Sequence, residues 1–184
     1  ACSPALVLDG YSGESAKTRA FRRLSRDLHD GGHAVLVFSQ FVKHLTLLRD
    51  VLDGEGIAYA YLDGSTPASR REELVRQFQA GDVPFFLISL KAGGTGLNLT
   101  AAEYVLHLDP WWNPAVEDQA SDRAHRIGQQ RAVTVYRLIA QGTVEEQIVE
   151  LHRTKRELAS QILEGTESVK RLSAEDLLRI LRRG

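Results

Sequence analysis

The feature that most constrains the fold is a set of short apolar runs that alternate with longer amphipathic segments. Residues 34–38 read AVLVF, and residues 85–89 read FFLIS. Continuous apolar runs of this length are typical of strands buried on both faces of a parallel sheet. Further strands are expected at residues 57–61, 104–108 and 132–138, with helical patterns between them. The sequence therefore predicts a three-layer α/β fold with a mostly parallel central sheet, although the strand order does not follow from it.

Charge and composition exclude several classes of function. The 184 residues carry a formal net charge of −1, so a nucleic-acid surface would have to be a local patch. The single cysteine, Cys2, excludes an internal disulfide and a cysteine zinc site, and the scattered histidines give no metal-ligand spacing, so we expect no bound metal. No apolar run approaches the ~20 residues that span a membrane, and no signal-peptide pattern is present. We expect an intracellular, soluble protein, and the start at Ala1 suggests a processed chain or a piece of a longer one.

Periodicity and composition divide the chain into four parts. Residues 1–16 are a loose lead-in rich in small residues, and residues 17–142 are the α/β domain. Residues 143–165 are a long helix that begins at a Thr-x-x-Glu capping box. Residues 166–184 are a polar linker followed by a short amphipathic helix that ends in arginines.

One predicted helix carries the strongest candidate for phosphate binding. The Asn-Pro pair at residues 113–114 supplies an N-cap and a first helical residue. Counting along the helix, Gln119, Arg123 and Arg126 share one face. Two guanidiniums and an amide on one stripe can bind phosphate oxygens. The alternative is a surface salt bridge, because Asp122 and Arg126 are also a favourable i,i+4 pair.

A glycine-rich loop, KAGGTGLNL, occupies residues 91–99. It is not a dinucleotide fingerprint, because Gly94 and Gly96 would need a third glycine where Leu99 stands. It is not a P-loop either, since Lys91 precedes the glycines and G-x-x-x-x-G-K-[ST] occurs nowhere in the chain. The chain has no phosphate cradle of its own. Such a loop at the carboxyl edge of a sheet still lets the backbone approach a ligand closely. The alternative interpretation is that the glycines only form a tight turn.

Two adjacent tryptophans, Trp111 and Trp112, follow the predicted fourth strand. Tryptophan is large and usually at least partly buried, so both could cover the core. We expect Trp111 to pack inside and Trp112 to face a ligand or a nucleic-acid backbone.

Four segments resemble, in order and spacing, the second RecA-like lobe of SWI/SNF-type (sucrose-non-fermenting) ATPases, a branch of superfamily-two helicases. They are VLVFSQF (35–41), LDGSTPASRREELVRQF (62–78), LISLKAGGTGLNLTAAEYVLHLDPWWNP (87–114) and DQASDRAHRIGQ (118–129). Lys91 is similar to the bacterial form, since eukaryotic remodellers usually have arginine there. Asp122 argues against an RNA-helicase lobe of the same superfamily, where glycine is more frequent.

The resemblance implies one half of a motor that binds ATP and Mg²⁺ between two lobes. The first lobe would carry the P-loop and the magnesium ligands, so this chain alone is not expected to hydrolyse ATP. Arg126 and Arg123 match the phosphate-sensing arginines, with Arg126 the stronger finger candidate, and Gln119 would help to position them. Gly96 and Asn98 match nucleotide-facing positions. The positions that match DNA-facing residues are Ser39, Gln40, Ser65, Arg70, Ser89, Lys91 and Trp112.

The resemblance also implies partners. They are the N-terminal RecA-like lobe of the same protein, double-stranded DNA, and a DNA-bound protein complex. The long helix at 143–165 resembles the brace helix that returns to the first lobe. The location would be the cytoplasm and nucleoid of a prokaryote or the nucleus of a eukaryote. A competing hypothesis is a stand-alone nucleic-acid-binding or regulatory module that hydrolyses nothing.

Overall fold

A five-stranded parallel sheet forms the centre of the computed structural model, which describes residues 13–93, 97–124 and 132–163. The strands lie in the order β2-β3-β1-β4-β5. Their bounds are β1 Val35–Ser39, β2 Tyr59–Leu62, β3 Phe85–Ser89, β4 Tyr104–His107 and β5 Thr134–Arg137. The central strand is the first in sequence, since Val35 pairs with both Phe85 and Tyr104. The predicted fold class is confirmed, and every described strand pair is parallel.

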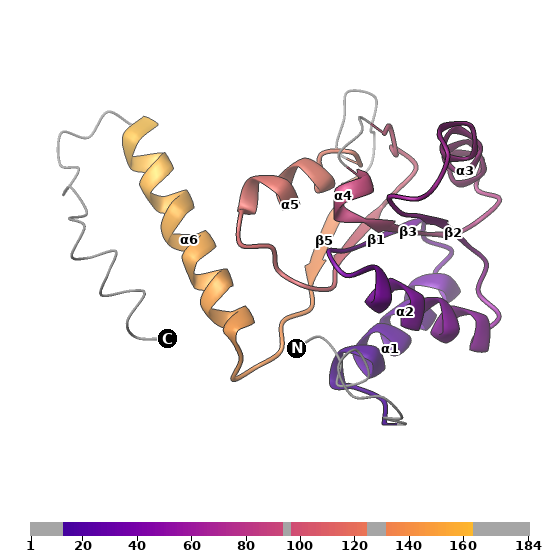
Figure 1. Ribbon diagram of the computed structural model, residues 1–184, viewed down its shortest axis with the longest axis horizontal. Helices are drawn as coiled ribbons and strands as arrows, with labels where there is room; N and C mark the ends of the chain where they lie inside the picture. Colours follow the sequence, from indigo (N-terminus) through magenta and orange to yellow (C-terminus); the bar gives the residue numbers. More distant parts are fainter. Residues whose placement is uncertain (1–12, 94–96, 125–131, 164–184) are drawn as a thin grey trace.

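Helices cover both faces of this sheet (Figure 1). Their bounds are α1 Ala16–Asp30, α2 Val42–Gly54, α3 Ala68–Ala80, α4 Leu90–Gly93, α5 Pro114–Ser121 and α6 Val144–Leu163. On one face Val35 and Val37 pack with residues of α1 and α2. On the other face Leu36 and Phe38 pack with residues of α3, α4 and α5. Successive side chains of β1 therefore face opposite sides of the sheet, and helices cover both sides. This explains why the strand has no polar residue before Ser39.

The helix ends follow the sequence signals closely but not in every detail. The Ser15 hydroxyl caps α1 by accepting from Thr18 N at 3.1 Å, and Asn113 caps α5 as expected. For α3 the cap residue is Pro67, which has no side-chain cap, and the neighbouring Thr66 Oγ1 accepts from Asp63 N at 3.1 Å. Thr66 therefore stabilises the turn before the helix and not the helix itself.

The cap of α6 is displaced from the expected box. Thr143 Oγ1 accepts from Glu145 N at 3.2 Å, and the Glu146 carboxylate accepts from Gly142 N at 2.8 Å. Each bond lies one residue before its place in the ideal motif. Two other expectations need correction: the glycine-rich segment begins as the short helix α4, and the second strand begins at Tyr59, not at residue 57.

The remaining expectations on domain organisation stay predictions. The final short helix and most of the lead-in lie outside the described residues. None of the described helices has the length and apolarity needed to cross a bilayer.

Candidate nucleotide and nucleic-acid site

The predicted site residues follow the carboxyl ends of the strands. In a parallel sheet these ends meet at one edge, where open α/β folds bind ligands. Ser39 ends β1, Ser89 ends β3, and Asp109 follows β4. The edge therefore gathers the segments that the sequence singled out separately.

A buried carboxylate joins two of these segments. Asp109 is 2% exposed, and its oxygens accept from Ser39 Oγ at 2.6 Å and from Gln40 N at 2.8 Å. Nδ1 of the fully buried His44 lies 3.5 Å from the same carboxylate. Gln40 Nε2 also donates to Pro110 O at 3.5 Å. The turn after β1 and the segment after β4 are thereby held together, and Gln40 lies partly exposed between them.

Two serines at positions predicted to face DNA point inward in this structure. Ser39 is fully buried and Ser89 is 3% exposed. Besides its bond to Asp109, Ser39 Oγ accepts from Phe41 N at 3.0 Å, and Ser89 Oγ accepts from Ala92 N at 3.4 Å in the first turn of α4. Their hydroxyls shape the backbone of the edge, so neither side chain is available at the surface.

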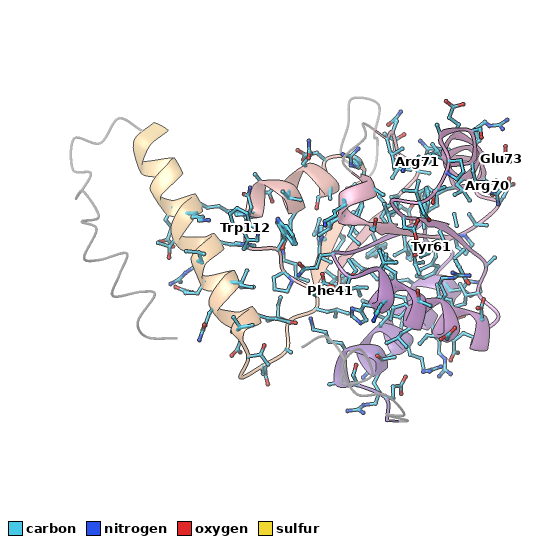
Figure 2. The ribbon with its side chains drawn as sticks, in the orientation of Figure 1. Phe41, Tyr61, Arg70, Arg71, Glu73 and Trp112 are labelled. Atoms are coloured by element: carbon cyan, nitrogen blue, oxygen red, sulfur yellow. The ribbon has the colours of Figure 1, made fainter. Side chains whose placement is uncertain are left out.

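The turn after β2 presents another predicted DNA-facing residue. Ser65 is exposed, and Asp63 Oδ1 accepts from its backbone N at 2.9 Å and from its hydroxyl at 2.6 Å. These bonds, the Ser65 hydroxyl first, lower the pKa of Asp63. Arg71 Nε donates to Thr66 O at 2.8 Å and fixes the far end of the turn. Arg70 on α3 is exposed beside it (Figure 2). Lys91 on α4 is exposed as well.

The tryptophans divide into a packed and an exposed ring. Trp111 is partly buried against the core, and its backbone N donates to Glu117 Oε1 at 2.7 Å. Trp112 is 59% exposed and lies beside α6 (Figure 2). Glu117 is fully buried and also pairs with Arg137 of β5, whose Nε lies 2.9 Å from Glu117 Oε2. The tryptophan loop, residues 110–113, is thus fixed to α5 and β5.

The phosphate-binding helix is shorter than the sequence predicted. Helix α5 ends at Ser121, and Arg123 lies in the turn that follows, so the expectation that Gln119 and Arg123 share a helical face is wrong. Arg123 is 4% exposed, and its backbone O accepts from Leu99 N at 3.1 Å. Arg126, with its alternative pairing to Asp122, lies outside the described residues.

One nucleotide-facing candidate of the glycine loop, Asn98, is brought close to Arg123 through its neighbour Leu99. Asn98 is exposed next to it, and its backbone O accepts from Gln79 Nε2 at 3.1 Å. Gln119 is exposed on α5. Gly96 lies outside the described residues. The structure thus brings Asn98 and Arg123 into neighbouring positions, while Gln119 lies one turn earlier on α5.

Comparison with known proteins identifies the family. A family model described as the helicase conserved C-terminal domain matches residues 16–128, which is more than half of the chain. The chain belongs to the helicase C-terminal domain family.

Relatives and solved structures place this helicase C-terminal domain among SNF2-type ATPases. It is similar to the Sulfolobus solfataricus SWI2/SNF2 ATPase core in complex with dsDNA, with 34% identity and a TM-score of 0.73 over 97% of this chain and 38% of that one. It is 40% identical over 181 residues to an uncharacterized ATP-dependent helicase of Mycoplasma pneumoniae, covering 97% of this chain and 18% of the relative. It is 43% identical over 157 residues to the chromatin-remodeling ATPase INO80 of Cryptococcus neoformans, covering 85% of this chain and 9% of that relative. The chain spans less than a fifth of the length of these two relatives.

The donor chemistry of the helicase C-terminal domain fits an anionic phosphate better than a metal ion. The candidate residues on the edge offer guanidinium, ammonium and amide groups. Within the described residues, no group of three or more His, Cys, Asp or Glu side chains is placed to hold a metal. The side chains at hand therefore suit ATP phosphates or a DNA backbone, and none of them is assigned to Mg²⁺.

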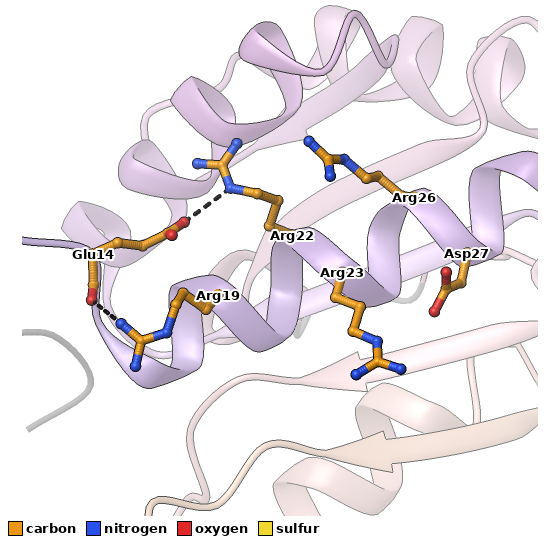
Figure 3. Close-up of a pocket in the computed structure, with 6 residues that line it drawn as sticks. All are labelled: Glu14, Arg19, Arg22, Arg23, Arg26 and Asp27. Carbon is orange, nitrogen blue, oxygen red and sulfur yellow. Dashed lines mark hydrogen bonds and ion pairs between the residues drawn. The ribbon is translucent and has the colours of Figure 1, made fainter.

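A second basic cluster of the helicase C-terminal domain lies on α1, along a hollow of about 450 Å³ (Figure 3). Two of its four guanidiniums are paired with carboxylates: Arg22 pairs with Glu14 and Glu55, and Arg26 pairs with Glu55. Arg19 Nη1 donates to Glu14 O at 2.8 Å. The hydrogen bonds from Arg26 and then Arg22 lower the pKa of Glu55 to about 2. This cluster ties α1 to α2, and it presents little net charge to a phosphate.

Sequence reasoning missed the groups that organise the edge. Asp63 and Asp109 could have been found, because Asp63 directly follows β2 and Asp109 directly follows the strand predicted at residues 104–108. Glu117 and His107 gave no such signal. His107 Nε2 shares a hydrogen bond with Ser121 Oγ at 2.9 Å, and burial lowers its pKa to about 4, so it is neutral near pH 7.

Proposed function

We propose that this chain is the second motor lobe of a DNA-stimulated, ATP-dependent translocase that moves along double-stranded DNA. The observation that carries the proposal is the exposed Trp112 on the same sheet edge as Ser65, Arg70 and Lys91, which are also exposed. Tryptophan is usually at least partly buried, so a ring that is 59% exposed on a basic edge suits contact with a nucleic-acid backbone. The solved relative in complex with dsDNA supports the choice of duplex DNA.

The reaction would be transfer of the γ-phosphoryl group of ATP to water. Charge that develops on the transferred group is stabilised by cations positioned before the reaction begins. We assign this role to Arg126, with Arg123 as a second arginine and Gln119 as a group that positions them. Gly96 and Asn98 would face the nucleotide. In the described conformation Arg123 is buried, which favours Arg126 as the residue that reaches the phosphate.

The other half of the site would come from the N-terminal RecA-like lobe of the same protein. That lobe would supply the P-loop and the ligands of Mg²⁺. We infer further that the complete motor acts on DNA or on a DNA-bound protein complex. Its place would be the nucleoid and cytoplasm in a prokaryote, or the nucleus in a eukaryote.

The proposal is tested first on the complete protein. We expect ATP hydrolysis that rises when duplex DNA is added. A complete protein that binds DNA but shows no hydrolysis under any condition would favour the competing hypothesis of a non-hydrolysing nucleic-acid-binding module. The sequence of the complete protein can separate these two hypotheses before any assay. For a motor, we expect it to contain G-x-x-x-x-G-K-[ST] before this chain.

Arg126→Ala in the complete protein should reduce turnover by about 10³–10⁵ while ATP and DNA binding stay nearly unchanged. The reason is that an arginine finger acts on charge that appears only in the transition state. Lysine at this position should restore little, because it keeps the charge but loses the planar fork. Turnover and ATP affinity are measured together for each variant.

The matched control is Asp122→Ala. If Arg126 serves only as a surface partner of Asp122, both variants should cost at most about 1 kcal/mol of unfolding free energy and leave turnover unchanged. Normal turnover in Arg126→Ala would therefore remove the arginine-finger assignment.

A further inference from the structure

One face of α6 lies against the tryptophan loop through three neighbouring side chains. His152, Lys155 and Arg156 have the i, i+3, i+4 spacing that places them on one helical stripe. His152 is 2% exposed, and its Nε2 donates to Trp111 O at 2.5 Å. Arg156 Nη2 donates to Asp118 Oδ1 of α5 at 2.7 Å. These two contacts fix the rotation of α6 about its own axis.

The third residue, Lys155, is held between those anchors and directly over the exposed ring. Its Nζ lies 5.6 Å from the centroid of Trp112. Both side chains are exposed, and Figure 2 shows Trp112 facing α6. The two anchors therefore present an ammonium group and an indole to solvent side by side.

Lys155 differs from its basic neighbours on α6 because those neighbours form ion pairs with carboxylates. Arg153 pairs with Glu150 at 2.7 Å and with Glu157 at 3.8 Å, and Arg156 pairs with Asp118. Among the residues that the structure describes, no carboxylate lies within ion-pair distance of Lys155. Within that part of the chain, its charge is therefore available to an anion from outside.

We propose that Lys155 binds a backbone phosphate of duplex DNA next to Trp112, so that α6 is part of the DNA-binding surface. The inference rests on the proposed function for the nature of the ligand. The chemistry fits because an ammonium is a compact charge that binds phosphate oxygens, while the adjacent aromatic ring can pack against the sugar of the same backbone. The resemblance implied that α6 is a brace helix that returns to the first lobe, and it assigned the helix no contact with DNA.

The test compares Lys155→Ala and Arg153→Ala in the complete protein. Affinity for a labelled DNA duplex is measured by fluorescence anisotropy at several salt concentrations. Log affinity falls as log salt concentration rises, and loss of one phosphate contact should make this slope less steep by about 0.9. The ratio of wild-type to Lys155→Ala affinity should then shrink by about threefold to fourfold when salt rises from about 50 to about 200 mM. Arg153→Ala, which removes a charge already paired on the same helix, should leave the slope unchanged.

Two further variants separate the possible outcomes. Lys155→Arg should keep most of the affinity, and Lys155→Gln should behave as alanine does. If Trp112→Ala weakens DNA binding while Lys155→Ala matches wild type in affinity and slope, the inference is wrong and the proposed function stands. If Lys155→Ala changes only the melting temperature, the cation–π contact is its whole role, and the inference is again wrong. A wild-type protein that binds no duplex DNA would overturn both.

Discussion

At the residue scale, short polar side chains inside the edge are as important as the exposed ones on it. Ser39 and Ser89 occupy positions that the family resemblance assigns to DNA-facing residues, yet their hydroxyls bond to Asp109 and to the start of α4. A motif match transfers a position in the fold, but the direction of a small side chain depends on the acceptors around it. Those acceptors come from segments far away in sequence, such as Asp109 for Ser39.

The two tryptophans should respond differently to truncation. Trp111→Ala should lower the free energy of unfolding by about 2–3 kcal/mol, somewhat less than the 3–5 kcal/mol typical of a fully buried ring. Trp112→Ala should stay within about 0.5 kcal/mol of wild type, because its ring is mostly exposed. Thermal or urea unfolding of both variants measures this. In the complete protein, Trp112→Ala should also make ATP turnover respond less to DNA.

The opposite pattern would reverse the assignment of the rings. If Trp112→Ala unfolds the domain while Trp111→Ala leaves it folded, Trp112 is the packing residue and the proposed DNA surface is misplaced.

At the element scale, α5 shows where sequence periodicity stops being informative. The i,i+4 pattern of Gln119 and Arg123 continues past Ser121, and no glycine or proline intervenes to end the helix. The helix ends because tertiary contacts compete: Arg123 O accepts from Leu99 N, and His107 bonds to Ser121 Oγ. Such contacts depend on the strand order, so a local pattern contains no sign of them.

A buried ion pair ties the first helix to the last described one. Lys17 Nζ lies 2.6 Å from Glu145 Oε2 and donates to Leu108 O at 2.6 Å. Both side chains are at least nine-tenths buried. Lys17→Ala should cost about 3–5 kcal/mol of unfolding free energy, because it leaves the Glu145 charge buried without its cation. Urea unfolding monitored by circular dichroism measures the loss.

The control for this pair is the exposed lysine of α2, Lys43. Lys43→Ala should change stability by no more than about 0.5 kcal/mol. The double variant Lys17→Met with Glu145→Leu should cost less than Lys17→Ala alone, since no uncompensated charge then remains inside. Equal losses in the single and double variants would mean that the bond to Leu108 O, and not the ion pair, is what stabilises the contact.

At the scale of the whole molecule, the order of elements was predictable and their spatial arrangement was not. Buried runs such as AVLVF signal strands because both faces of a covered sheet are apolar. All five strands and most of the helices between them were expected close to their observed places, whereas α4 was expected as a loop and α5 as a longer helix. The order β2-β3-β1-β4-β5 depends on pairings between distant segments, and nothing local in the sequence specifies them.

The isolated 184-residue chain should show no measurable ATP hydrolysis, even with duplex DNA and magnesium present. It contains no G-x-x-x-x-G-K-[ST] segment, so it cannot cradle the β- and γ-phosphates by itself. A steady-state assay with the complete protein as positive control decides this. Turnover comparable to the complete protein would contradict the two-lobe proposal.

The central place of β1 has a consequence for how the chain is made. Of the five described strands, β1 leaves the ribosome first, yet both of its neighbours come later: Val35 pairs with Phe85 and with Tyr104. At about 5–20 residues per second, β1 waits on the order of 3–10 s for β3 alone. During that interval VLVF is an unpaired apolar strand, the kind of segment that associates with other chains. The topology that completes the sheet therefore leaves its most apolar strand exposed for longest during synthesis, which is where chaperone binding would matter most.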